Sequence, residues 1–109
     1  MAESRSVELT SVRRAGRVEE SLTLLSAVAD PVRWTVLSTL ANQGTSCVCD
    51  LQERVPVAAN LLSYHLKVLR DAGLVTTSKR GRWIDYSLAE DASRRLTEAL
   101  PLADLAALT

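Results

Sequence analysis

The sequence contains no phenylalanine and only two tyrosines and two tryptophans among its 109 residues. Because strands are enriched in aromatic residues, this scarcity argues against a strand-rich fold. No apolar run approaches the roughly 18 residues that a membrane-spanning helix needs. The N-terminus also lacks the apolar segment of a secretion signal. We therefore expect one small, mainly helical domain in the cytoplasm.

Groups that catalyse reactions are scarce as well. The chain has a single histidine, His65, no glycine-rich loop that could hold phosphates, and no nucleophile and base at a recognisable spacing. His65 stands among the leucines of a helical pattern, so we interpret it as a partly buried helix residue. These absences argue against an enzyme, and a net charge of zero indicates no particular partner.

Helical spacing and helix-boundary residues organise the first half of the chain. Residues 1–16 are polar and predict a flexible N-terminal arm, followed by one domain over residues 17–109. An apolar stripe in "VEESLTLLSAVAD" predicts the first helix. In "DPVRWTVLSTLANQG", Asp30 suits the cap of a helix, Pro31 its first turn and Gly44 its end. This segment therefore predicts a second helix with both boundaries defined.

A third and a fourth helix follow within a few residues of each other. "SCVCDLQERV" predicts a short helix capped by Ser46 and stopped by Pro56. "AANLLSYHLKVLRDAG" repeats the helical spacing through its leucines, and Gly73 ends it. Two helices joined so closely indicate a helix-turn-helix arrangement.

The period of the pattern then changes. "LVTTSKRGRWIDYSL" is rich in β-prone residues around a turn at Arg80 and Gly81, which predicts a β-hairpin. The Leu/Ala-rich end, "EDASRRLTEALPLADLAALT", predicts a last helix that Pro101 kinks. About five helices with a two-stranded wing after the helix-turn-helix form a winged helix. We expect Trp34, Trp83 and Tyr86 to fill core or wing-packing positions.

Although the chain as a whole has no net charge, one segment of it is basic. Residues 56–88 contain five lysines or arginines and two acidic residues, a net charge of +3. One face of the fourth helix and the hairpin tip are predicted to contact double-stranded DNA. Residues near the start of the helix would reach base edges, and those further along would contact phosphates. The residues predicted to contact DNA are Asn60, Ser63, Tyr64, Lys67, Arg70, Lys79, Arg80 and Arg82. The arm arginines Arg13, Arg14 and Arg17 are either solvated or touch phosphates as well.

The two cysteines, Cys47 and Cys49, stand one residue apart in "TSCVCDLQERV". In a reducing cytoplasm a structural disulfide is not expected, which leaves free thiols or a metal site. Thiolates favour soft effectors such as As(III), Hg(II), Cd(II), Zn(II) or Cu(I), and Ni(II) could be held with backbone nitrogens. Two thiols alone do not determine which of these ions binds. Tetrahedral Zn(II) or Cd(II) would need two more ligands, for which Asp50 and water are candidates.

The spacing of the cysteines also suggests a mechanism. Residues two apart on a regular helix point to nearly opposite sides. We therefore expect metal binding to unwind the first turn of the short helix, displace the recognition helix and lower DNA affinity.

Four segments in order resemble one family. "ADPVRWTVLSTL", "SCVCDL", "LLSYHLKVLRDAGLV" and "KRGRWIDYSL", between about residues 20 and 90, look like the ArsR/SmtB family of metal-sensing winged-helix repressors. The C-V-C-D-L run resembles the metal-binding box of the arsenic-responsive members. The resemblance implies a homodimer formed by the first and last helices, with operator DNA released when a thiophilic metal or metalloid binds Cys47 and Cys49.

Some positions depart from that pattern. Gln52 occupies the place of a third cysteine, the last helix has no histidine for a zinc or nickel site, and the recognition helix begins with "VAAN" rather than a serine cap. The alternative is a winged-helix regulator that responds to redox, to nickel at another site or to a protein partner, with vestigial cysteines. Repression and activation are both compatible with these residues.

Overall fold

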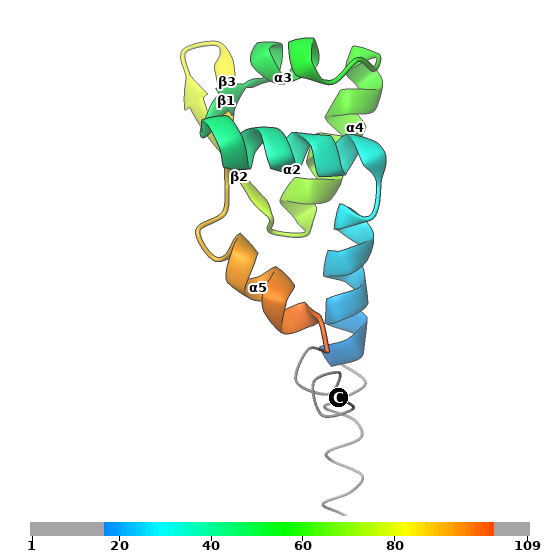
Figure 1. The fold of residues 1–109 in the computed structure, drawn as a ribbon. Helices are drawn as coiled ribbons and strands as arrows, with labels where there is room; N and C mark the ends of the chain where they lie inside the picture. The colour runs from blue at the N-terminus through cyan, green and yellow to red at the C-terminus, as the bar shows by residue number, and fades with distance from the viewer. Residues whose placement is uncertain (1–16, 102–109) are drawn as a thin grey trace, which may run out of the picture.

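The computed structural model describes residues 17–101, and the predicted arm over residues 1–16 lies outside them. Within the described residues the chain forms five helices and a three-stranded antiparallel sheet (Figure 1). In chain order these are a helix over residues 17–28, α2 (Pro31–Gln43), β1 (Ser46–Cys47), α3 (Val48–Arg54), α4 (Ala59–Asp71), β2 (Val75–Arg80), β3 (Trp83–Leu88) and α5 (Ala92–Ala99). The predicted winged helix is confirmed.

The boundaries of α2 are those that the sequence predicts. One carboxylate oxygen of Asp30 accepts hydrogen bonds from the backbone N–H groups of Val32 and Arg33, at 2.9 and 3.0 Å. Gly44 ends the helix at a φ of 79°, a conformation that side chains with a Cβ disfavour, and its N–H donates to Leu40. Both ends of α2 therefore have backbone groups satisfied by the residues that the sequence supplies.

The core lies where α2, α3 and α4 meet. Leu62, Leu66 and Leu69 of α4 are buried, as their helical spacing predicts, and they belong to one apolar cluster with Leu51 of α3 and Val36 of α2. Full burial of a leucine side chain contributes about 2 kcal/mol. This cluster fixes which face of α4 is left for solvent.

The sheet differs from the expected two-stranded wing. Its order is β1-β3-β2, so β3 lies in the middle and the two residues of β1 pair with Tyr86 and Asp85. A two-residue strand has no periodicity that a sequence pattern could reveal. The hairpin turn is at Gly81 and Arg82, one residue later than predicted, so that Arg80 belongs to β2 and pairs with Trp83.

Of the three aromatic residues expected in core or wing-packing positions, Tyr86 is buried in the core cluster, which confirms the prediction for it. Trp34 is 62% exposed on α2, and Trp83 is 48% exposed on the hairpin. The Trp34 indole therefore lies largely in solvent, and that of Trp83 is about half covered on the wing. None of the helices over residues 17–101 is long and apolar enough to cross a membrane.

Candidate DNA-binding surface and metal site

The face of α4 opposite the core carries the residues that the sequence assigns to DNA. Five side chains on this face are exposed, those of Asn60, Ser63, Tyr64, Lys67 and Arg70. The helix begins after Ala58, whose side chain makes no capping hydrogen bond, as the "VAAN" segment predicts. The first turn of α4 therefore keeps backbone N–H groups that no side chain caps.

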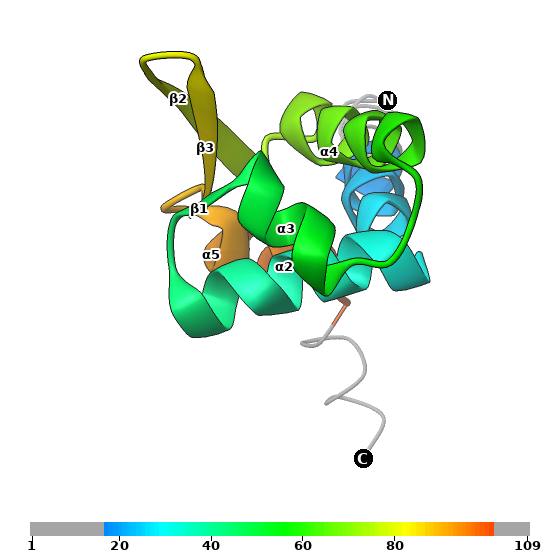
Figure 2. The same ribbon diagram turned by 90° about the horizontal axis from the view of Figure 1, so that it is seen from above.

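The hairpin carries the second basic group, Lys79, Arg80 and Arg82, and all three side chains are exposed. The hairpin and α4 lie on either side of α3, and the hairpin projects from the body of the molecule (Figure 2). Arg80, unlike the other two, is held by Asp85: its Nε donates to one carboxylate oxygen at 3.0 Å and its Nη2 to the other at 3.3 Å. These hydrogen bonds lower the pKa of Asp85 and raise that of Arg80.

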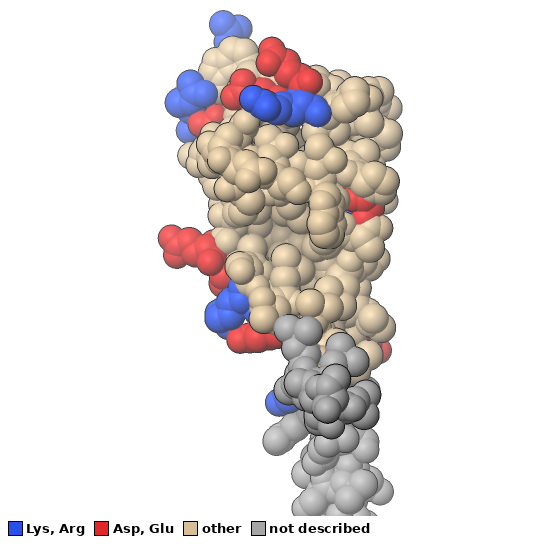
Figure 3. Space-filling model, viewed as in Figure 1, with Lys and Arg blue, Asp and Glu red and all other residues tan. Residues whose placement is uncertain are grey.

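Acidic side chains lie among the basic ones at the end of the molecule formed by the hairpin and α3 (Figure 3). Besides Asp85, the negative charge of Asp50 on α3 contributes to the raised pKa of Arg80. The wing is therefore not a uniformly positive surface. Among the described residues, Lys79 and Arg82 make no ion pair, whereas Arg80 already has an anionic partner.

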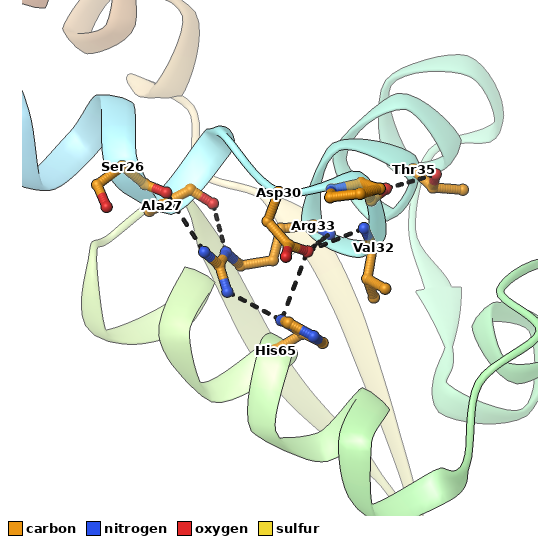
Figure 4. Close-up of polar contacts among 8 residues, drawn as sticks. Ser26, Ala27, Asp30, Val32, Arg33, Thr35 and His65 are labelled. Carbon is orange, nitrogen blue, oxygen red and sulfur yellow. Dashed lines mark hydrogen bonds and ion pairs between the residues drawn. The ribbon is translucent and has the colours of Figure 1, made fainter.

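A partly buried polar cluster, which the sequence pattern does not reveal, holds the inner side of α4 (Figure 4). His65 is 7% exposed, and its Nδ1 lies 2.9 Å from Nη1 of Arg33 and 3.7 Å from the carboxylate of Asp30. Arg33 also donates to the carbonyl oxygens of Ala27 and Ser26 at the end of the residue 17–28 helix, at 2.6 and 3.3 Å. One side chain of α2 thus joins three helices. The expectation of a partly buried helix histidine is confirmed.

The structure differs from the sequence-based predictions in two ways at the cysteines. Cys47 and Cys49 are joined by a disulfide, with their Cα atoms 5.3 Å apart, so they are not free thiols in this structure. Cys47 rather than Ser46 is the cap of α3, in extended backbone conformation, and its Sγ accepts from the N–H of Asp50 at 3.3 Å. The Ser46 hydroxyl donates instead to Gly44.

These positions explain why the geometric argument from helical spacing is wrong. Cys47 precedes α3 and belongs to β1, so the directions of side chains on a regular helix apply only to Cys49. The two sulfur atoms therefore meet while α3 begins at Val48 with its first turn intact. Unwinding of α3 is not needed to bring them together.

The ligand atoms of Cys47, Cys49 and Asp50 lie within 4.8 Å of one another. Two thiolates with a carboxylate form a donor set that suits a thiophilic ion, once the disulfide is reduced. Gln52, at the position where a third cysteine would stand, donates from its amide to the carbonyl of Val57 and so braces the connection to α4. Among the described residues, the carboxylate that lies beside the two sulfur atoms is that of Asp50.

Comparisons with known proteins give the same picture. The family described as "Bacterial regulatory protein, arsR family" matches residues 30–77. The arsenical resistance operon repressor of Bacillus subtilis is 43% identical over 65 residues, 60% of this chain, and the match spans 62% of that repressor's length.

Two further likenesses extend over nearly whole chains. An HTH-type transcriptional regulator of Methanocaldococcus jannaschii is 32% identical over 81% of this chain and 96% of its own. The crystal structure of an ArsR family transcriptional regulator superposes with a TM-score of 0.71 at 27% identity, over 83% of this chain and 90% of that one. The resemblance carried by the four sequence segments is therefore confirmed: this chain belongs to the ArsR family of winged-helix transcriptional regulators, which are not a family of enzymes.

Proposed function

We propose that this protein is a repressor that binds operator DNA as a homodimer and releases it when a thiophilic metal or metalloid ion binds at Cys47 and Cys49. The observation that carries the proposal is the convergence of both sulfur atoms and the Asp50 carboxylate at the start of α3, the first helix of the helix-turn-helix. The repressor of Bacillus subtilis that this chain resembles is named for arsenical resistance. As(III) is accordingly the first effector to test.

The exposed face of α4 supports DNA binding in the major groove. Asn60, Ser63 and Tyr64 lie near the start of the helix, where recognition helices contact base edges. Lys67 and Arg70 lie one and two turns further on, where they suit phosphates. The uncapped N–H groups of the first turn add donors for a phosphate oxygen. Lys79, Arg80 and Arg82 on the hairpin supply a second contact with the backbone.

Dimerisation is supported by the other end of the molecule. The residue 17–28 helix exposes apolar side chains, with Val18 at 54% and Leu22 at 59%. A groove beside this helix and α5 is lined mostly by charged and polar side chains, among them Glu20, Arg95 and Glu98, with Leu24, Ala72 and Ala99 between them. A second copy of the chain would cover apolar surface that one small domain leaves in water. A two-fold dimer then places two α4 helices on successive half-sites of an operator.

The effector site requires the reduced state. A disulfide offers no thiolate, so two electrons and two protons from a thiol or phosphine reductant must convert the pair into thiols that deprotonate on metal binding. Two thiolates satisfy linear Hg(II) or Cu(I), whereas As(III) needs a third ligand, such as Asp50 or a small-molecule thiol. Cd(II) and Zn(II) need two more ligands, and Ni(II) could recruit backbone nitrogens.

Fluorescence anisotropy of the full-length protein on DNA from upstream of its own gene tests this function. The reduced protein is titrated with As(III), Hg(II), Cd(II), Zn(II), Cu(I) and Ni(II), beside the double variant Cys47→Ser/Cys49→Ser. We expect at least one ion to release the wild type and to leave the variant bound. DNA binding that no ion weakens would refute metal sensing at this pair.

The same titration separates redox response from metal response. If the oxidised protein, with Cys47 and Cys49 joined, loses the operator and no ion releases the reduced protein, the signal is the disulfide itself. If the reduced protein loses DNA only when an ion is added, the pair is a metal sensor. The serine variant serves as the control in both cases, because it can neither form the disulfide nor bind a metal through thiolates.

A further inference from the structure

The candidate metal site is joined to the wing by the pairing of two strands. Cys47 is the register partner of Asp85 across the pairing of β1 with β3. Asp85 in turn opposes Ser78 of β2, and its carboxylate holds both ends of the Arg80 guanidinium fork. Because β1 has only two residues, a displacement of Cys47 acts on β3 at Asp85 itself, with no intervening element.

The pair formed by Arg80 and Asp85 has the geometry of a specific contact. Exposed ion pairs contribute little when their side chains are free to move. Here both carboxylate oxygens accept from one guanidinium, an arrangement that fixes direction as well as distance. The Asp85 side chain is only 16% exposed, whereas that of Arg80 is 66% exposed. A mostly covered carboxylate thus sets the direction of an arginine that is open to a partner.

A second acidic group links the same arginine with the metal site. Asp50, the third member of the candidate ligand group, makes a small contribution to the raised pKa of Arg80, after the larger effect of Asp85. A divalent ion that displaces the two thiol protons leaves the net charge of the group unchanged, but ligation of the Asp50 carboxylate draws its negative charge onto the ion. Binding at the cysteines therefore acts on the wing chiefly through the strand that carries Asp85, which pairs with Cys47.

We propose that Asp85 is a positioning residue that couples the cysteine site with the wing, because it holds Arg80 in the orientation suited to DNA phosphate until an effector binds at Cys47 and Cys49. Asp85 acts through Arg80 and contacts neither the DNA nor the ion. The inference deepens the proposed function and rests on it. It replaces the expected unwinding of α3 with a route through the sheet.

The test compares DNA affinity with and without effector in the reduced, full-length protein. Arsenite alone and Cd(II) alone serve as probes, and the coupling is the ratio of the two dissociation constants. For the wild type we expect a ratio of at least about fivefold, the low end of ordinary allosteric couplings. Asp85→Asn retains the size of the side chain but removes its charge, so we expect this ratio to fall towards one. Ultraviolet thiolate–metal absorption should show unchanged metal affinity.

Three further variants make the result specific. Asp91→Asn removes an exposed carboxylate 3.8 Å from Arg94 at the start of α5, away from the wing, and should leave the ratio unchanged. Asp85→Glu restores the charge and should recover part of the coupling. Arg80→Lys keeps the positive charge without the two-pronged geometry and should lose coupling while it retains the salt dependence of DNA binding.

Each outcome decides the inference. If folded Asp85→Asn, checked by circular dichroism, keeps the wild-type ratio, the positioning role is refuted while the proposed function stands. If Asp85→Asn loses metal affinity, Asp85 supports the ligands rather than the wing and the inference is again refuted. If neither arsenite nor Cd(II) changes the DNA affinity of the wild type, release by these ions fails, and the coupling through Asp85 fails with it.

Discussion

Arg33 of α2 donates a hydrogen bond of 2.9 Å to Nδ1 of His65 on α4. Since a guanidinium has no acceptor, Nδ1 must carry the lone pair, which assigns the imidazole hydrogen to Nε2. The Asp30 carboxylate is 3.7 Å from the same nitrogen, beyond hydrogen-bond length. Helix α4 is therefore held on its inner side by an arginine that also donates hydrogen bonds to the end of the residue 17–28 helix.

Replacement of His65 tests this contact. We expect His65→Leu to lower the free energy of unfolding by about 1–3 kcal/mol, because Arg33 loses a partner in a partly buried position. His65→Gln, whose amide oxygen can accept from Arg33, should recover part of the loss. Urea unfolding followed by circular dichroism measures both. A His65→Leu protein as stable as the wild type would show that packing, not the hydrogen bond, holds α4 here.

The ionisation of Asp30 is expected to make the free energy of unfolding depend on pH. The Arg33 backbone N–H that donates to it holds the pKa of the Asp30 carboxyl below its ordinary value in the folded protein. A lowered folded pKa stabilises the protein at pH values above the unfolded pKa of about 3.9, and this contribution is lost as the pH falls through the folded value. Asp30→Asn keeps capping ability without the charge.

We therefore expect the wild type to be more stable than Asp30→Asn at pH 6, with the difference shrinking below about pH 4. Urea titrations of both proteins at pH 6 and pH 3 measure it. A difference that is the same at both pH values would mean that the charge of Asp30 contributes nothing and that its hydrogen-bonding shape alone matters.

The exposed face of α4 predicts two kinds of DNA defect. Lys67→Ala should weaken binding to all sequences alike and reduce the slope of log affinity against log salt concentration by about one. Asn60→Ala should leave that slope unchanged and reduce discrimination between operator and altered operator by about 1–3 kcal/mol. Anisotropy titrations at several salt concentrations on both DNAs separate the two. If Asn60→Ala lowered both affinities equally, Asn60 would contact the backbone.

Gly73, at the end of α4, combines a positive φ of 74° with a close neighbour. A Cβ added there would lie 2.7 Å from Nη1 of Arg95, which donates to the carbonyls of Gly73 and Ala72. We expect Gly73→Ala to cost about 1–2 kcal/mol for the left-handed backbone and more for the displaced arginine. Gly81→Ala, at a φ of 62° with open space around it, should show the backbone cost alone. Equal losses of unfolding free energy would show that Arg95 moves aside freely.

The sequence predicts most of this fold because each long element carries its own signals. Asp30, Pro31 and Gly44 mark α2, and the leucines of α4 mark the face that is buried, so the exposed residues of its opposite face follow. Residue type alone does not predict burial, as Trp34 shows, since a large apolar residue on a helix need not face the core.

The candidate site was less accessible to sequence reasoning because it depends on register. A two-residue strand such as β1 cannot be detected from alternation, so the extended backbone of Cys47 was missed. A turn placed one residue too early puts Arg80 in the loop rather than in β2, which hides its pairing with Asp85. Long-range polar contacts, such as Arg33 with His65 across 32 residues, have no local sequence signal.

The exposure of both indoles gives the molecule its own optical reporters. Trp34 and Trp83 are the only tryptophans of the chain, and Trp83 lies on the hairpin directly after Arg82 and opposite Arg80. In a Trp34→Phe protein all tryptophan emission would come from the wing, so that this emission follows the hairpin as it enters or leaves a duplex. Quenching by iodide would then report the shielding of that one ring without any attached dye.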